Sequence, residues 1–202
     1  MTDKSKILEH SARLFLRLGI RNVTMDDIAN DLGISKRTLY EHFESKESII
    51  SKIVDFHIEN EKYQFEKIQN ESKNAIEMMI RLSDLIFHMY NKLHPSVMSD
   101  LKKHYTESWK SIESFHTEAI REIIEQNIIL GIREGLYRID IDPVVLSLLF
   151  VKQLQLFSDD SNIHLEKKSK PDIIQQFFDY NMYGLLSKKG IDNYRKIKTN
   201  TN

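Results

Sequence analysis

Apolar residues recur at intervals of three and four along most of the chain, which is the spacing of one face of an α-helix. The first run begins at Lys4 and ends before Gly19. Further helical runs are expected at 45–68, 75–93, 106–134, 143–156 and 173–185. A short helix is also expected to open at Pro95, because proline suits the first turn of a helix, and the polar segment 69–73 is expected to be a linker. The pattern predicts an all-α protein.

Two short helical patterns lie close together between residues 24 and 43. Thr24 can cap the first of them, with Asp27 three residues later completing a capping box. Gly33 follows this helix where a left-handed backbone is needed, and Ser35 can cap the second helix. Two helices joined by so short a turn cannot lie side by side, so they cross steeply. This geometry predicts a helix-turn-helix.

The second of these helices has one apolar face and one polar face. Leu39 and Phe43 lie four residues apart and are expected to point inward. A rotation of about 100° per residue then places Arg37 and Glu41 on the outer face. Guanidinium, hydroxyl and carboxylate groups on an exposed helix are those that read base edges in the major groove of DNA. Base reading is expected from Ser35, Lys36, Arg37, Thr38 and Glu41.

The stretch from Gly33 to Glu47 resembles the tetracycline-repressor (TetR/AcrR) family of bacterial transcription regulators. Its sequence is G-I-S-K-R-T-L-Y-E-H-F-E-S-K-E, and the most specific part is T-L-Y-x-H-F followed by Lys46. The resemblance covers residues 5 to 55 or so. It implies that phosphates are held by Thr24, Tyr40, His42 and Lys46. The alternatives are capping alone for Thr24, a place at the edge of the core for His42, and a helix-turn-helix that only packs or binds protein.

The chain is expected to divide into a three-helix DNA-binding domain at residues 1–50 and a helical bundle at residues 51–202. The last two strong helices are apolar on more than one side, although one stripe suffices for a helix on the surface of a monomer. The second face predicts a homodimer in which these helices and their symmetry mates form a four-helix bundle. The expected interface residues are Val145, Leu149, Ile174, Phe178, Met182 and Leu185. Such a dimer would bind double-stranded DNA at a palindromic operator. The family resemblance implies a repressor, and nothing in the sequence excludes activation.

The family resemblance also implies a small hydrophobic effector, bound among the C-terminal helices, that releases the DNA. The candidate ligand-binding residues are Met78, Leu82, Met89, Tyr105, Trp109, His116 and Gln153. His116 and Gln153 are polar groups on apolar faces and are the best candidates to orient a ligand. Methionines and aromatic residues at helical spacing are also typical of an ordinary core, and this alternative stays open.

Composition and charge add three restrictions. The chain has no cysteine, so neither a disulfide nor a thiolate site is expected. The longest apolar run, Val144 to Val151, is too short to span a bilayer, and we expect a cytoplasmic protein without membrane contact. The chain has 29 basic and 30 acidic residues, which predicts modest non-specific DNA affinity with specificity carried by a few contacts. The basic tail from Lys188 is expected to be a solvated end rather than a second DNA contact.

An enzyme is the remaining class of function. Glu113 and His116 form the Glu-x-x-His unit of di-iron carboxylate bundles, but that chemistry needs two such units and the chain has one. The sequence contains no G-x-S-x-G, no H-E-x-x-H and no phosphate-binding loop. We therefore predict no enzyme activity, catalytic residue, metal or cofactor. A helical protein-interaction module and a carboxylate-histidine metal-dependent enzyme are the alternatives to a DNA-binding regulator.

Overall fold

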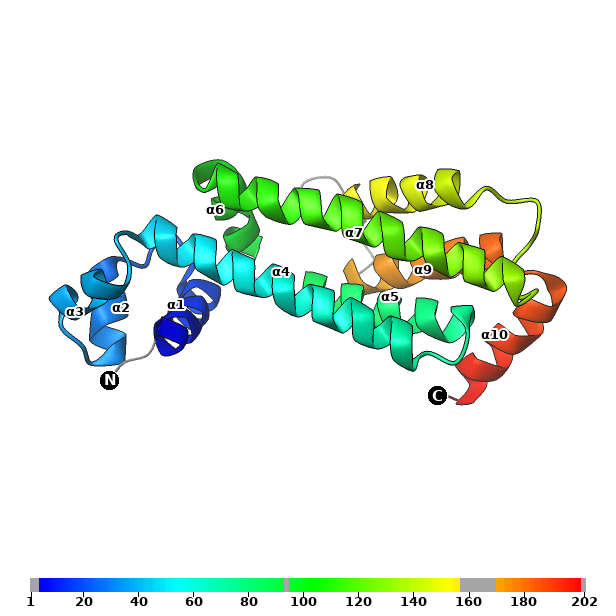
Figure 1. The fold of residues 1–202 in the computed structure, drawn as a ribbon, viewed down its shortest axis with the longest axis horizontal. Helices are drawn as coiled ribbons and strands as arrows, with labels where there is room; N and C mark the ends of the chain where they lie inside the picture. The colour runs from blue at the N-terminus through cyan, green and yellow to red at the C-terminus, as the bar shows by residue number, and fades with distance from the viewer. Residues whose placement is uncertain (1–3, 93–94, 157–169, 201–202) are drawn as a thin grey trace. The chain divides into compact units, whose positions relative to one another are not determined.

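The structure is a computed structural model that describes residues 4–92, 95–156 and 170–200. The described residues form ten helices and no β-strand (Figure 1), which confirms the all-α prediction. The helices are α1 (Lys4–Leu18), α2 (Met25–Leu32), α3 (Lys36–His42), α4 (Lys46–Glu71), α5 (Ala75–Lys92), α6 (Pro95–His104), α7 (Thr106–Arg133), α8 (Pro143–Gln155), α9 (Lys170–Leu185) and α10 (Lys188–Asn200).

The chain forms two compact units. Unit 1 comprises Met1–Lys62 and Lys92–Phe115, and unit 2 comprises Tyr63–Asn91 and His116–Asn202. The division falls within α4 and within α7, not at residue 50 where the sequence pattern suggested a boundary. Helix α6 and the first part of α7 therefore belong with the N-terminal helices.

Unit 1 has a single apolar core to which both of its chain segments contribute. Helices α1, α2 and α3 lie beside the start of α4 (Figure 1), and α6 and α7 add Val97, Leu101 and Ile112 to the same core. The other buried residues of this core are Ile7, Leu14, Phe15, Ile20, Val23, Met25, Ile28, Ala29, Leu39, Phe43, Ile49, Ile50 and Val54. The helix-turn-helix thus shares one apolar core with α6 and α7 as well as with α1.

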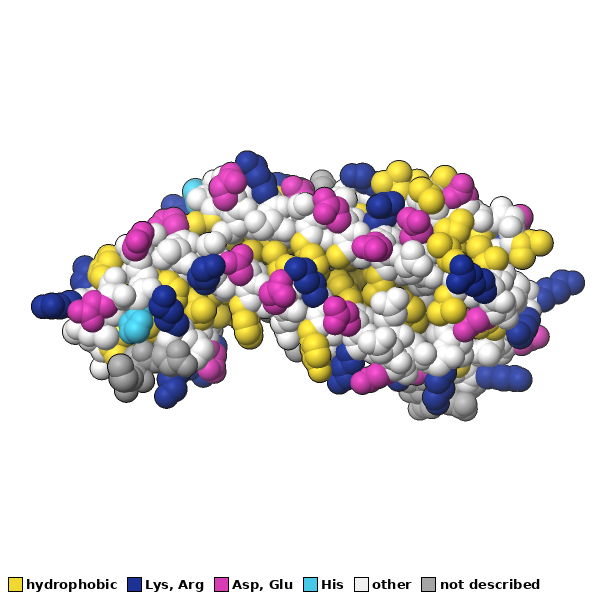
Figure 2. Space-filling view, viewed as in Figure 1, with side chains coloured by type: hydrophobic (Ala, Val, Ile, Leu, Met, Phe, Trp, Pro, Cys, Tyr) yellow, Lys and Arg dark blue, Asp and Glu magenta, His cyan; other side chains and the backbone are white. Residues whose placement is uncertain are grey.

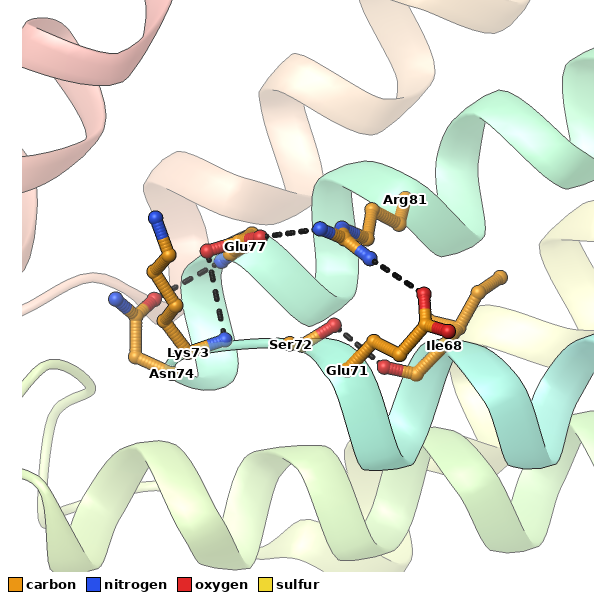
Figure 3. A network of polar contacts seen from close by, with 7 residues as sticks. All are labelled: Ile68, Glu71, Ser72, Lys73, Asn74, Glu77 and Arg81. Atoms are coloured by element: carbon orange, nitrogen blue, oxygen red, sulfur yellow. Dashed lines mark hydrogen bonds and ion pairs between the residues drawn. The ribbon is translucent and has the colours of Figure 1, made fainter.

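The turn between α4 and α5 is shorter than the predicted linker at 69–73, because α4 continues to Glu71. Polar side chains hold it together (Figure 3): the Ser72 hydroxyl donates to the carbonyl of Ile68, and the Asn74 side chain accepts from the backbone N–H of Glu77 at 3.0 Å. Arg81 pairs with Glu77 at 2.7 Å and reaches Glu71 at 3.6 Å. Because these contacts lie between the end of one helix and the start of the next, they cap both helices.

Hydrogen bonds and aromatic contacts connect α5 to α7 and α8 to α9 within unit 2. The buried amide of Asn127 on α7 donates to the carbonyl of Ala75 on α5 at 2.8 Å, and the Tyr137 hydroxyl donates to the Asn127 side chain at 3.0 Å. Burial raises the pKa of the Tyr137 phenol far above its ordinary value, so the group stays neutral. Between α8 and α9, the Phe150 ring packs on Phe177 and Phe178, with centroids 5.2 and 5.6 Å apart.

Helix α10 was not expected, because the basic tail was predicted to be a solvated end. Its Tyr194 is 3% exposed, and the Tyr194 hydroxyl donates to Asp179 on α9 at 2.8 Å. Lys198 pairs with the same carboxylate. Burial acts to raise the pKa of Asp179, but hydrogen bonds from Lys198 and Tyr194 outweigh it and hold the pKa below its ordinary value. The carboxylate therefore stays charged and fixes α10 to the unit.

Candidate nucleic-acid interface

The helix-turn-helix is built by the caps that the sequence predicts. The Thr24 hydroxyl accepts from the backbone N–H of Asp27 at 3.2 Å, and the Asp27 carboxylate accepts from the Thr24 backbone N–H at 2.8 Å, which completes the capping box. The bond from the Thr24 hydroxyl lowers the pKa of Asp27. Gly33 ends α2 with φ 65°, and Ser35 caps α3 by accepting from the backbone N–H of Thr38 at 3.0 Å. These groups set the angle at which α3 leaves α2.

Helix α3 turns its apolar side into unit 1 and its polar side outward. Leu39 is fully buried and Phe43 is 6% exposed, whereas the Arg37 side chain is 89% exposed. Among the other predicted DNA-binding residues, Thr24, Ser35, Lys36, Tyr40 and Glu41 are exposed, and Thr38, His42 and Lys46 are half-buried. Nearly all of the predicted contact residues therefore reach the surface on or beside one helix.

Each exposed cation of α3 has a carboxylate partner. Lys36 Nζ lies 2.8 Å from Asp26 Oδ1 on α2, and Arg37 Nε lies 3.2 Å from Glu41 Oε1 one turn along α3. The hydrogen bond to Asp26 raises the pKa of Lys36, so this ammonium stays charged. We call the exposed residues Asp26, Lys36, Arg37 and Glu41 the recognition face. Its formal charge is balanced, and sequence reasoning missed Asp26 because its pairing depends on how α2 crosses α3.

Lys46, which the family resemblance implies to hold a phosphate, makes its hydrogen bonds within unit 1. Its ammonium donates to the backbone carbonyls of Ile20 at 3.1 Å and Val23 at 2.9 Å, and it lies 6.0 Å from the centre of the Tyr105 ring. Two of its three N–H donors are therefore used inside unit 1. The phosphate contact of Lys46 stays a prediction.

The residues predicted to bind an effector are distributed over both units. Tyr105 and Trp109 pack against the apolar core of unit 1. Met78 and Leu82 are fully buried in unit 2, His116 and Gln153 of the same unit are half-buried, and Met89 lies outside the residues whose side chains are described. Tyr105, Trp109, Met78 and Leu82 therefore lie in an ordinary core environment, which was the alternative to ligand binding.

A groove of about 820 Å³ lies in unit 2 between α8 and α9, and Gln153 is one of its lining residues. Gln153 accepts a hydrogen bond there from the Asn181 side chain at 3.2 Å. The other lining residues are Ile124, Ile128, Arg138, Leu146, Leu149, Phe150, Gln176, Asp179, Tyr180, Tyr183, Gly184 and Leu185. The groove combines apolar walls with a few amide and phenol groups, which is typical of small-molecule sites.

The six predicted interface residues differ in how far a single chain exposes them. Ile174, Phe178, Met182 and Leu185 are at most 5% exposed within a single chain, because this stripe of α9 packs inside unit 2. Val145 and Leu149 are each 50% exposed. The surface that a partner could cover, which we call the α8–α9 patch, consists of Val144, Val145, Leu148, Leu149, Tyr180 and Tyr183. Figure 2 shows hydrophobic side chains exposed over α8.

Two further features bear on the class of protein. Among the described residues, no three His, Asp or Glu side chains lie close enough together to hold a metal ion. None of the described helices combines the length and the apolar character needed to cross a bilayer.

Residues 7–53, which include the whole helix-turn-helix, match the family model described as bacterial regulatory proteins, tetR family. The chain is 30% identical over 114 residues to the uncharacterized HTH-type transcriptional regulator YvaF of Bacillus subtilis, covering 56% of this chain and 60% of that protein. It is 28% identical over 146 residues to the HTH-type transcriptional repressor KstR2 of Rhodococcus jostii, covering 69% of this chain and 70% of the repressor.

The fold is also that of known regulators. A transcriptional regulator from Saccharomonospora viridis, crystallised with choline, superposes with a TM-score of 0.63 at 21% identity, over 92% of this chain and 98% of that one. The helix-turn-helix, the family match and the fold agree with one another. Residues 7–53 thus form a DNA-binding domain of the kind found in bacterial regulatory proteins of the tetR family.

Proposed function

We propose that this protein is a transcriptional regulator that inserts α3 into the major groove of its operator. The observation that carries the proposal is the recognition face, a set of paired polar side chains on α3 and the adjoining Asp26 of α2. Helix α3 is capped by Ser35 and anchored by the buried Leu39. A helix held this rigidly presents its side chains to base edges in one orientation. The match of residues 7–53 to regulatory proteins and the repressor named among the relatives support the same function.

The recognition face supplies the base-reading groups of this proposal. Arg37 can pair bidentately with guanine, and Glu41 can accept from the amino group of cytosine while repelling phosphates. Ser35, Lys36 and Thr38 lie at the start of α3, where the helix would first meet the bases. Thr24, Tyr40 and His42 are proposed to contact phosphates on either side of the groove.

The proposed regulator is a homodimer joined through the α8–α9 patch. A patch of exposed apolar side chains on two adjacent helices is what a four-helix interface buries. In such a dimer the two copies of α3 would lie about 34 Å apart and face successive major grooves of a palindrome.

A small hydrophobic effector is proposed to bind in unit 2, where the groove between α8 and α9 offers Gln153 and Asn181 as polar partners. The Saccharomonospora viridis regulator, which has a similar fold, was crystallised with choline, and this supports a small-molecule site. Leu149, Tyr180 and Tyr183 line the groove and also belong to the α8–α9 patch. A ligand there would therefore act on the proposed interface and, through it, on the spacing of the two recognition helices.

The experiment that tests the function is selection of bound sites from random duplex DNA with the purified protein. An inverted repeat with half-sites about one helical turn apart is the expected product. The matched control carries alanine at Lys36, Arg37, Thr38 and Glu41 and keeps Leu39 and Phe43, so the domain should fold without the proposed base-reading side chains of α3. Enrichment of no sequence by the wild-type protein would overturn the proposal and favour a protein-interaction module.

A further inference from the structure

The turn that joins α1 to α2, at residues 19–23, is held by side chains from distant parts of unit 1. Gly19 adopts φ 82°, and the Asn22 amide donates to the Leu18 carbonyl at 2.8 Å, which caps the end of α1. The turn leads directly into Thr24, the N-cap of α2. Its conformation therefore sets where α2 begins.

Lys46, at the start of α4, binds the carbonyl side of this turn. Its ammonium bonds to Ile20 O and Val23 O, and the second of these carbonyls belongs to the residue before the cap. The ring of Tyr105, which stands between α6 and α7, lies 6.0 Å from the same ammonium. A cation near an aromatic ring and two carbonyl dipoles is stabilised without a carboxylate partner.

Asp100, on α6, binds the N–H side of the turn. Its Oδ2 accepts from the backbone N–H of Arg21 at 3.1 Å. The turn also lies close to α6 at Gly19, where a Cβ would stand 3.1 Å from the Ser96 hydroxyl. A polar cavity of about 380 Å³ at this junction is lined by Gly19, Arg21, Asn22, Ser96 and Asp100.

We propose that Asp100 and Lys46 are positioning residues for DNA binding, which together fix the 19–23 turn and thereby the placement of α2 and α3. This inference rests on the proposed function and assigns Lys46 a role inside the protein instead of at a phosphate. Asp100 sits on a helix that follows α3 by more than fifty residues and contributes none of its own groups to the recognition face. It acts on DNA through the turn alone.

The role of Asp100 is tested by a variant in which the lost charge and the lost turn contact change DNA affinity in opposite directions. Asp100→Ala removes a negative charge, which by electrostatics alone would strengthen binding to the polyanion. We expect it instead to weaken binding of the selected operator by about 3- to 10-fold, because the Arg21 N–H loses its acceptor and the turn is released.

Two variants separate this effect from charge. Asp100→Asn keeps an oxygen acceptor at the same place, and we expect operator binding within about twofold of wild type. Glu113→Ala removes the same charge from an exposed position on α7 within unit 1 and should leave binding unchanged or slightly stronger. Equal affinities for Asp100→Ala and Glu113→Ala would overturn the role of Asp100.

Lys46 is tested by the salt dependence of binding. Lys46→Met keeps the aliphatic stem and removes the ammonium. A lost phosphate contact would lower the slope of log K against log salt by about 0.9 per protomer, whereas a lost positioning contact lowers affinity on every sequence and leaves the slope unchanged. We expect an unchanged slope with affinity reduced by about tenfold. A slope reduced by the full contact would overturn the assignment of Lys46.

A measurement without DNA tests the contact between Asp100 and the turn independently of the proposed function. Hydrogen exchange of the Arg21 amide in the free protein should be faster in Asp100→Ala than in wild type and Asp100→Asn. Unchanged exchange in all three would refute the turn contact even if the protein selects no operator. Rapid exchange in Asp100→Ala together with no operator for wild type would instead contradict the function and leave the contact standing. Thermal unfolding of each variant checks that the fold is intact.

Discussion

The two cations of the recognition face are paired with carboxylates in the absence of DNA. Arg37 with Glu41 and Lys36 with Asp26 are exposed ion pairs, and such pairs contribute little to the free energy of unfolding because water screens them. Their geometry still restricts where each guanidinium or ammonium group points. The pairs therefore matter more for orientation than for stability.

Replacing Arg37 by alanine is the first prediction at this scale. Loss of a bidentate contact to guanine should cost about 1 to 3 kcal/mol of operator binding and relax the sequence preference at one position of each half-site. Competition binding with single-base operator variants measures both effects. An equal loss on every DNA tested would refute base reading by Arg37, and the exposed position makes a change in unfolding temperature unexpected.

A second prediction concerns His57 on α4. Its Nε2 lies 2.9 Å from the carboxylate of Glu61, which is buried, and this hydrogen bond raises the pKa of His57 although partial burial acts against it. A raised pKa means that the charged form is favoured in the folded state. The resulting stability is fully present below the ordinary histidine pKa of 6.5 and is lost as the pH rises through the folded value.

The measurement is the urea midpoint at about pH 5.5 and about pH 8.5, compared with that of His57→Gln. Glutamine can still donate to Glu61 but does not titrate. Wild-type protein should lose more stability over this interval than the variant. Parallel pH profiles would show that the pair does not stabilise the fold through protonation.

At the scale of helices, the sequence predicted those helix ends that are set by a capping residue close by in the chain. Thr24, Gly33 and Ser35 cap where expected, because each cap satisfies backbone groups within three or four residues of itself. The contacts of Lys46 and Asp100 could not be predicted in the same way. They depend on the path of a turn and on a helix distant in sequence, and neither leaves a local pattern.

Helix α9 shows a second limit. It carries two apolar stripes of similar strength, and periodicity alone does not say which stripe meets the core and which meets a partner. The structure buries Ile174 and Phe178 and exposes Tyr180 and Tyr183. The two tyrosines could have identified the outer stripe, because tyrosine suits a surface that is half apolar and half hydrated.

Helix α10 was hidden by its basic composition. Ile191, Tyr194 and Ile197 recur every three residues and give the inner face, but the surrounding lysines and arginine resemble a solvated tail. Its docking depends on Gly190, because a Cβ there would stand 2.0 Å from the backbone carbonyl oxygen of Leu136.

Gly190→Ala should therefore destabilise unit 2 through displacement of α10. The expected loss is about 1 to 3 kcal/mol or more, because a backbone atom cannot move aside as a side-chain end can. Urea unfolding measures the loss. Gly184→Ala is the control, since nothing lies within 4 Å of the added Cβ and helix propensity alone should stabilise it by up to about 1 kcal/mol. Similar stabilities for the two variants would contradict close packing at Gly190.

At the scale of the whole molecule, the α8–α9 patch is the proposed contact surface for a second copy of the chain. Leu149→Glu should dissociate the proposed dimer, because it places a charge at the centre of an apolar contact, and should leave the protomer folded, since Leu149 is half exposed. Sedimentation equilibrium measures the association and operator titration measures its consequence for DNA binding.

The control for this prediction is Ile139→Glu, because Ile139 is 86% exposed and lies in the turn between α7 and α8, outside the patch. It should remain dimeric. A wild-type protein that sediments as a monomer at every concentration, or a Leu149→Glu variant that still dimerises, would contradict the proposed assembly.

The balanced charge of the recognition face bears on how such a regulator would be distributed in a cell. Stretches of chromosome that lack the operator would attract this face weakly, since Lys36 and Arg37 must each first separate from a carboxylate partner. Few copies would be sequestered on irrelevant sequence, and a small number of molecules per cell would suffice to keep the operator occupied.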